Sequence, residues 1–280
     1  MMAGMKCVRY CCLPLMFFVL AGCADGPISR DFTYVSHPIL LEGPEVSGDP
    51  ISGAADISMY SAPRFNGGNL QVAQTYTLLS KYQSIDREPA LYSLAGTLGV
   101  AENVDIKLRF TNEGSGLTSN ASGSLNLGMK LQLWGKPESA QAVGNKWAIG
   151  FSHFNPVPST HNETLTKNKD STVSADLSTK TGVMHLYTVF GSRLDTNTLI
   201  YTNLFYIDSI YRTDLVTDVE STRIDISSTQ KGMLMGVRYT FTEKHQYIAL
   251  EAGATRTRLK HHGLGEDQFI MGLKVGKAWY

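Results

Sequence analysis

The chain has 280 residues, of which 25 are basic and 25 acidic, so its formal net charge is zero. Only 18% of the residues are charged, which is below the roughly 25% of an average soluble domain. The sequence contains no basic run and no basic–aromatic stripe, so nothing in it indicates nucleic-acid binding.

The first 22 residues have the pattern of a secretory signal peptide. Lys6 and Arg9 form a short basic region, and a mainly apolar stretch, residues 13–20, follows. This stretch is too short to span a bilayer as a helix. Small residues come next, directly before Cys23. We therefore expect residues 1–22 to be removed during export.

The sequence Leu-Ala-Gly-Cys, residues 20–23, resembles the lipobox of bacterial lipoproteins. The resemblance implies that a diacylglycerol is attached to Cys23 and that signal peptidase II cuts before it. The other three cysteines would leave with the signal peptide, so the mature chain would form no disulfide and have no cysteine metal ligand. Ala24 follows the lipidated position, which favours sorting to the outer membrane by the lipoprotein-sorting machinery. The alternative is an ordinary secretory signal followed by a chance cysteine.

Residues 23–68 differ in composition from the rest of the chain. They hold five of its ten prolines, and Gly, Ser and Asp interrupt every periodic segment. We expect a lipid anchor and a Pro/Gly-rich linker here, with residues 55–62 able to form one short strand. The remaining residues, 69–280, are predicted to form a β-barrel domain.

From residue 69 onward, apolar and polar residues alternate between clusters of turn residues. Residues 104–110, Val-Asp-Ile-Lys-Leu-Arg-Phe, place four apolar side chains on one face and three charged side chains on the other. No proline occurs after Pro158, as a long sheet-forming region requires. We predict ten strands, at residues 69–80, 90–99, 104–112, 122–134, 146–155, 172–191, 198–212, 230–242, 246–258 and 268–280.

Short links at 101–103, 194–197 and 242–245 alternate with longer polar links at 113–121, 156–171, 213–229 and 259–267. This arrangement resembles Gram-negative outer-membrane β-barrels, which are built with the help of the barrel-assembly machinery. In lipid an open sheet edge would leave backbone groups without partners, so the sheet must close. We expect an all-β fold, an antiparallel up-and-down barrel of about ten strands (8–12). A soluble barrel in the periplasm, with its apolar face inward, is the alternative.

Two stretches of the sequence contain residue types that can carry out chemistry. Ser152 and His153 are adjacent on a predicted strand, so their side chains point to opposite faces and do not form a nucleophile–base pair. His261, His262, Glu266 and Asp267 fall in a polar loop, and we interpret them as solvated rather than as metal ligands. The sequence therefore predicts no catalytic residue, no metal, no cofactor and no enzymatic activity.

Charged residues opposite the apolar rows would line the lumen of a membrane barrel. They are Asp105, Lys107, Arg109, Lys130, Arg238, Glu251, Arg256 and Lys274. Because a ten-stranded barrel is narrow, the mixed signs favour an ion-paired network that plugs the lumen over a water-filled pore.

We accordingly predict an outer-membrane lipoprotein, held by its covalent lipid, with a structural or surface-interaction role. The links at 156–171 and 213–229 would form its contact surface. Two alternatives stay open at this point: a narrow channel for small solutes, and a periplasm-facing, lipocalin-like carrier of an apolar ligand.

Overall fold

The structure is a computed structural model. It describes residues 29–35, 42–61, 64–71, 77–78, 90–113, 122–156, 159–167, 171–217, 221–241, 243–260 and 265–280. Cys23, the signal peptide and His261 and His262 lie outside the described residues. The predictions about them stay predictions.

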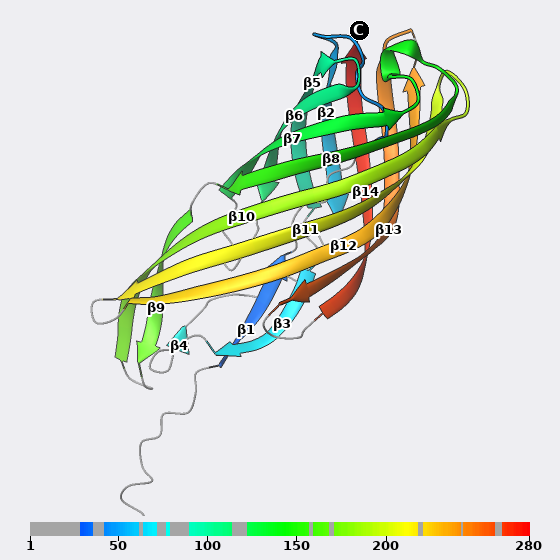
Figure 1. Ribbon diagram of the computed structural model, residues 1–280. Helices are drawn as coiled ribbons and strands as arrows, with labels where there is room; N and C mark the ends of the chain where they lie inside the picture. The colour runs from blue at the N-terminus through cyan, green and yellow to red at the C-terminus, as the bar shows by residue number, and fades with distance from the viewer. Residues whose placement is uncertain are drawn as a thin grey trace, which may run out of the picture.

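Ten antiparallel strands form a closed barrel, which confirms the predicted fold class (Figure 1). Each wall strand pairs with the next along the chain, and the last pairs with the first. The wall strands are β2 (Gly53–Ser61), β5 (Ala90–Ala101), β6 (Val104–Glu113), β7 (Ser122–Trp134), β8 (Gly144–Pro156), β10 (Ser171–Arg193), β11 (Thr198–Thr217), β12 (Ser221–Phe241), β13 (Gln246–Leu259) and β14 (Gly265–Trp279).

Shorter elements accompany the wall. They are β1 (Ser29–Val35), β3 (Arg64–Gln71), β4 (Thr77–Leu78), β9 (Ser159–Lys167) and a 3-10 turn, η1 (Glu138–Ala140). Strand β1 pairs with β3, and β9 pairs with β10 and β4. In the described part of the chain, no helix is long and apolar enough to cross a membrane.

The first wall strand corrects the sequence-based strand boundaries. It is β2, and the barrel therefore begins at Gly53 instead of residue 69. Among the described residues of the range 69–80, none belongs to the wall. Part of that range belongs to β3, which pairs with β1, and to β4, which pairs with β9. The nine residues of β2 suffice because about nine to eleven tilted residues cross a bilayer, so a short strand between prolines still completes the wall.

Four described links between wall strands lie at the same end of the barrel as the C-terminus, which we call the turn end. They are residues 102–103, 135–143, 194–197 and 243–245. In the link after β10, Asp195 Oδ1 accepts hydrogen bonds from the backbone N–H groups of Asn197 and Thr198, each 2.7 Å long. These two bonds hold the pKa of the Asp195 carboxyl below its ordinary value. The opposite end, where β2 finishes, is the loop end.

The apolar rows of the strands face outward. This orientation decides between the membrane barrel and the soluble barrel, which the sequence left as alternatives. Leu127, Val237 and Met271 are among the many large apolar side chains exposed on the outer wall. Their strand neighbours Asn126, Arg238 and Ile270 are buried inside. An exposed apolar surface that surrounds a whole barrel fits a lipid bilayer and not water, so the soluble carrier is the wrong reading.

Aromatic side chains frame this apolar surface at both ends. The turn end carries Trp134, Trp147, Phe190, Tyr239, Phe241, Trp279 and Tyr280, and the loop end carries Tyr92, Phe110 and Phe269. On β14, Phe269 and Trp279 are ten residues apart, which is about 33 Å along a strand and about 25 Å along the axis of a tilted barrel. This height equals that of the apolar band in outer-membrane barrels.

Inside the wall, aromatic rings lie over glycines of the neighbouring strand. Tyr187 pairs with Gly150 and Tyr201 with Gly236; Phe205–Gly232 and Tyr247–Gly276 repeat the arrangement. A Cβ added to Gly150 would lie 2.1 Å from the Tyr187 ring. The glycines therefore provide the space that the rings fill, and each pair fixes its register.

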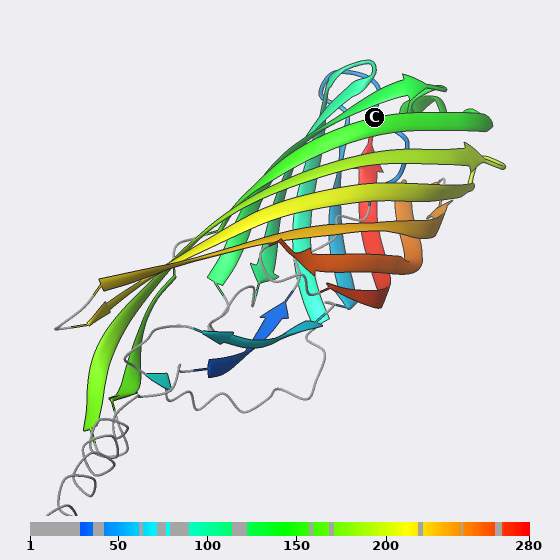
Figure 2. The same ribbon diagram turned by 60° about the horizontal axis from the view of Figure 1, so that its bottom comes forward.

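Strands β10, β11 and β12 are much longer than the bilayer requires, with 23, 20 and 21 residues. Strand β10 pairs with β8 only from Val183 onward, and its first part pairs with β9 instead. We call β9 with residues 171–181, 211–217 and 221–226 the strand extension; Figure 2 shows it projecting beyond the barrel at the loop end. The described residues of the two links predicted at 156–171 and 213–229 are thus largely strand. The sequence there is polar because these strands lie beyond the lipid, and this polarity was wrongly interpreted as irregular structure.

Candidate functional site: the lumen and the segment that fills it

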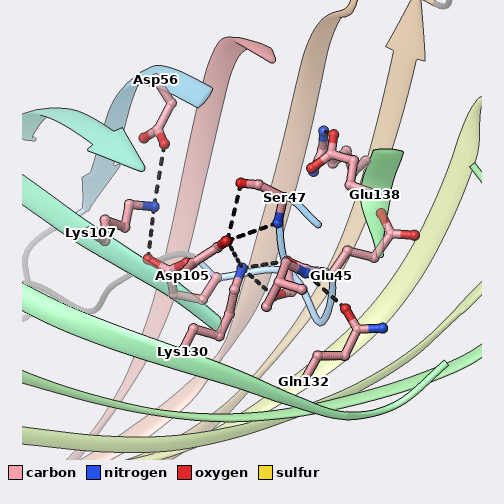
Figure 3. A network of polar contacts seen from close by, with 12 residues as sticks. Glu45, Ser47, Asp56, Asp105, Lys107, Lys130, Gln132 and Glu138 are labelled. Carbon is pink, nitrogen blue, oxygen red and sulfur yellow. Dashed lines mark hydrogen bonds and ion pairs between the residues drawn. The ribbon is translucent and has the colours of Figure 1, made fainter. Parts of the chain in front are cut away.

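The lumen contains part of the chain's own N-terminal region. Residues Glu42–Gly48, which we call the lumen segment, lie inside the wall and are nearly all buried. After them the chain turns at the turn-end rim, where Ile51 N–H donates to the Gly99 carbonyl (3.1 Å) and Trp279 Nε1 donates to the Ile51 carbonyl (3.1 Å). Strand β2 then starts up the wall. Figure 3 shows the polar contacts that hold the segment.

Glu42 lies near the middle of the lumen among cations of β6. Its Oε1 is 2.9 Å from Lys107 Nζ and 3.2 Å from Arg109 Nη2. Lys107 also lies 3.3 Å from Asp56 Oδ2 on β2. The Arg109 side chain is only 1% exposed, so without Glu42 it would be a buried charge with little compensation.

Glu45 binds two cations on the other side of the lumen. Arg193 Nε donates to Glu45 Oε1 over 2.7 Å, and Arg193 Nη2 pairs with Oε2. Lys146 Nζ lies 3.1 Å from Oε1. All three side chains are about 1% exposed. This planar two-bond arrangement is the strong, geometrically specific form of an arginine–carboxylate pair.

The backbone of the segment is also bound by the wall. Val46 N–H donates to Gln132 Oε1 (2.9 Å), and Ser47 N–H lies 3.0 Å from both carboxylate oxygens of Asp105. Lys130 Nζ donates to the Glu45 carbonyl. An irregular segment can stay buried only if its backbone groups find partners, and these side chains supply them.

The link between β7 and β8 covers the segment at the turn end. Glu138 N–H donates to the Val46 carbonyl (2.8 Å), and Ser139 N–H donates to the Ser47 carbonyl (3.3 Å). The Glu138 carboxylate reaches across the barrel to Arg238, which donates from Nη1 over 3.1 Å and from Nη2. Arg238 in turn lies over the Tyr247 ring, 3.9 Å from its centroid.

The described wall has more inward cations than inward carboxyl groups. The cations are Lys107, Arg109, Lys130, Lys146, Arg193, Arg238 and Lys274, and the carboxyl groups are Asp56, Asp105 and Glu251. Glu42, Glu45 and Glu138 supply three further carboxylates from outside the wall strands. The lumen segment and η1 therefore neutralise most of the excess positive charge of the wall.

The structure places seven of the eight predicted lumen residues on the inner face: Asp105, Lys107, Arg109, Lys130, Arg238, Glu251 and Lys274. Arg256 is the exception. Its side chain is 60% exposed and pairs with Asp267 at 3.1 Å on the outside. The physical reason is the strand period of two: Glu251 and Arg256 are five residues apart on β13 and cannot share a face.

Several lumen residues were missed from the sequence. Lys146 is the first residue of the strand predicted at 146–155, and Arg193 lies two residues beyond the strand predicted at 172–191. Following the alternation to the ends of β8 and β10 would have found both. Glu42, Glu45 and Glu138 lie in irregular segments with Pro or Gly beside them. No periodicity marks such residues as inward-facing.

As predicted, Ser152 and His153 do not form a pair, because their side chains lie on opposite faces of the strand. Instead its Oγ lies 3.3 Å from Nδ1 of His185, its register partner on β10. Both side chains are buried, and His185 stacks on Tyr187 with 5.1 Å between ring centroids. The pair combines a hydroxyl with a base, but neither of the two cavities described below is lined by it.

The described surface includes the following two cavities. One, of about 630 Å³, opens at the turn-end rim beside Glu102, Gln132 and Trp134. The other, of about 420 Å³, is an apolar groove on the outer wall over β7, β8 and β10. Among the described residues, no group of three or more His, Cys, Asp or Glu side chains is placed to hold a metal ion.

The closed ten-strand barrel, its outward apolar band and its polar interior define the class: an outer-membrane-type β-barrel protein. No family model matches the chain, and a search of curated proteins finds no match. Among solved structures, the chain is similar to the crystal structure of the outer membrane protease OmpT from Escherichia coli, with 8% identity and a TM-score of 0.39 over 90% of this chain and 97% of that one.

This comparison corrects one expectation. The sequence predicted that the protein is not an enzyme, but a barrel to which it is similar is a protease. The expectation that the protein is not an enzyme is therefore withdrawn. At that identity and TM-score, the comparison assigns no activity to this chain and no role to any of its residues.

Proposed function

We propose that the protein is a lipid-anchored outer-membrane barrel whose strand extension binds other polypeptides at the cell surface. The observation that carries the proposal is the pair of open sheet edges in the extension. A closed barrel has no edges, but the extension creates two beyond the lipid. In the described part of the chain, β9 pairs on its far side only at Leu165 and Thr166, with β4. Among the described strands, β11 is the ladder partner of residues 221–226 of β12, and the ladder with β13 begins at Ser228.

Such edges offer a row of backbone donors and acceptors to an extended peptide, which can add to the sheet as a further strand. The extension is long enough for this mode: its eleven residues on β10 cover about 35 Å. The filled lumen supports the same role, because a barrel closed by its own chain serves as a rigid base.

A deletion tests the proposal without disturbing the barrel. Removing residues 157–180 and 212–225, with Tyr211→Asn and Ile226→Gly as a two-residue turn, leaves the pairs Phe154–Val183 and Ile210–Ser227 to close two short hairpins. We expect this variant to keep the heat-modifiable gel mobility of a folded barrel.

Binding is read with a photo-crosslinking amino acid placed on intact cells. At Asn162 in β9 or Arg223 in β12, we expect adducts to an extended stretch of a second polypeptide, identified by mass spectrometry of the joined peptides. The control position, Lys244 at the turn end, should give none of them. If both edge positions give no adduct, or the same adducts as Lys244, the surface-contact function is wrong.

The excess of inward cations favours a second candidate, a channel for small anions that opens when the lumen segment is displaced. The native protein should then conduct little in a planar bilayer. The double variant Glu42→Gln/Glu45→Gln should conduct with a preference for chloride over potassium. Equal, low conductance of both proteins would exclude the channel.

A further inference from the structure

The lumen segment has a direction that fixes where the rest of the N-terminal region must go. Ser47 is bound by Asp105, one residue from the turn-end start of β6, whereas Glu42 is bound by Arg109 near the middle of that strand. From Ser47 back to Glu42, the chain therefore moves away from the turn end and toward the loop end.

The preceding described element lies beyond the loop end. Val35, the last residue of β1, pairs with Arg64, the first residue of β3. Arg64 follows Ser61, the loop-end residue of β2, by only three positions. Figure 2 shows β1 and β3 beside the end of the barrel from which the strand extension projects.

The chain between these two points is short. Six residues separate Val35 from Glu42, so the two Cα atoms can be at most about 25 Å apart. A path that left through the turn end would first have to run from Glu42 along half the lumen to that end. It would then have to return to the loop end along the whole outer wall, an apolar band of about 25 Å. The chain is too short for that path, and its backbone would cross lipid without hydrogen-bond partners.

We propose that the N-terminal region threads the barrel and leaves it through the loop end, so that the two ends of the mature chain lie on opposite sides of the membrane. A ten-strand barrel alone would place both ends on the turn-end side. The lumen segment adds an extra passage through the wall's interior. If Cys23 carries lipid, which rests on the lipobox proposal, its acyl chains insert into the outer leaflet from the cell surface and not into the inner leaflet from the periplasm.

Single cysteines read the topology directly, because a lipid-modified Cys23 has no free thiol and the other cysteines leave with the signal peptide. Ser29→Cys on β1 is labelled on intact cells with a membrane-impermeant maleimide, and the yield is divided by that of the denatured protein. Arg258→Cys reports the loop end and Glu102→Cys the turn end; both side chains are exposed. A protease site inserted between Gly26 and Pro27 gives a second readout that does not depend on the exposure of residue 29.

We expect Ser29→Cys to be labelled as Arg258→Cys is, and the inserted site to be cut by protease added to intact cells. We expect Glu102→Cys to be labelled only after the cells are permeabilised. If Ser29→Cys is also labelled, and the inserted site also cut, only after permeabilisation, the proposal is overturned. Mass spectrometry of the same samples separates threading from anchoring. A chain accessible from outside but without lipid supports threading and overturns the surface anchor.

Discussion

Glu45 and Arg193 are 148 residues apart in the sequence and form a two-bond ion pair inside the barrel, with Arg193 Nε donating to Glu45 Oε1 over 2.7 Å. The pair joins an irregular segment near the N-terminus to the end of β10. Since both side chains are almost fully buried, neither charge can be left without the other at low cost. The lumen segment is therefore part of the core of the folded barrel and not an appended tail.

Removing this pair should destabilise the barrel. Glu45→Gln leaves Arg193 and Lys146 buried without their carboxylate, and we expect a loss of about 3–5 kcal/mol in the free energy of unfolding. Urea-induced unfolding in detergent micelles measures it. Arg256→Gln is the matched control, because its pair with Asp267 is exposed and should contribute less than about 1 kcal/mol. Equal effects of the two variants would contradict a structural role of the lumen segment.

Charges introduced on the outer wall should prevent assembly. Leu127→Arg places a cation near the middle of the apolar band, where it costs about 2–4 kcal/mol. Val237→Arg lies two residues from Tyr239, nearer the turn end, and should cost less. The fraction with heat-modifiable mobility after membrane extraction reports folding. Leu127→Met keeps the surface apolar and should assemble normally. Normal assembly of both arginine variants would mean that this face does not contact lipid.

The glycine–aromatic pairs predict a position-dependent cost of adding one methyl group. Gly150→Ala would bring its Cβ to 2.1 Å from the Tyr187 ring, whereas a Cβ at Gly182 meets nothing within 4 Å. Overpacking of this kind costs about 1–3 kcal/mol. Thermal unfolding of the two variants should show a lower midpoint only for Gly150→Ala. A comparable loss in Gly182→Ala would contradict overlap with the Tyr187 ring as the cause.

The lipobox predicts the mature N-terminus. Mass spectrometry of the membrane-extracted protein should show a chain that starts at Cys23 and carries acyl groups. Cys23→Ser should abolish the lipid, while the barrel, once exported through another secretory signal, should still resist carbonate washing. A mature chain that begins elsewhere and has no lipid would show that the cysteine follows an ordinary signal peptide by chance.

The sequence by itself determined the barrel and most of its wall. Nine of the ten wall strands fall where the alternation predicts them, because side chains of a strand change face at every residue and a local pattern of apolar and polar residues reports this directly. The same period assigns inward positions along β6, such as Asp105 and Arg109. The same period should also have excluded Arg256 from the lumen, since its position and that of Glu251 on the strand differ by an odd number of residues.

Tertiary structure alone decided which face is outside and what fills the inside. Alternation is the same for an apolar row that contacts lipid and for one that packs a soluble core, so only closure of the sheet with Leu127 outward separates the two. The contacts of Glu42 and Glu45, and the pairing of Ser152 with His185, join positions 33 to 148 residues apart. Such contacts leave no local periodicity in the sequence, because they arise only when the closed wall brings distant strands around one narrow lumen.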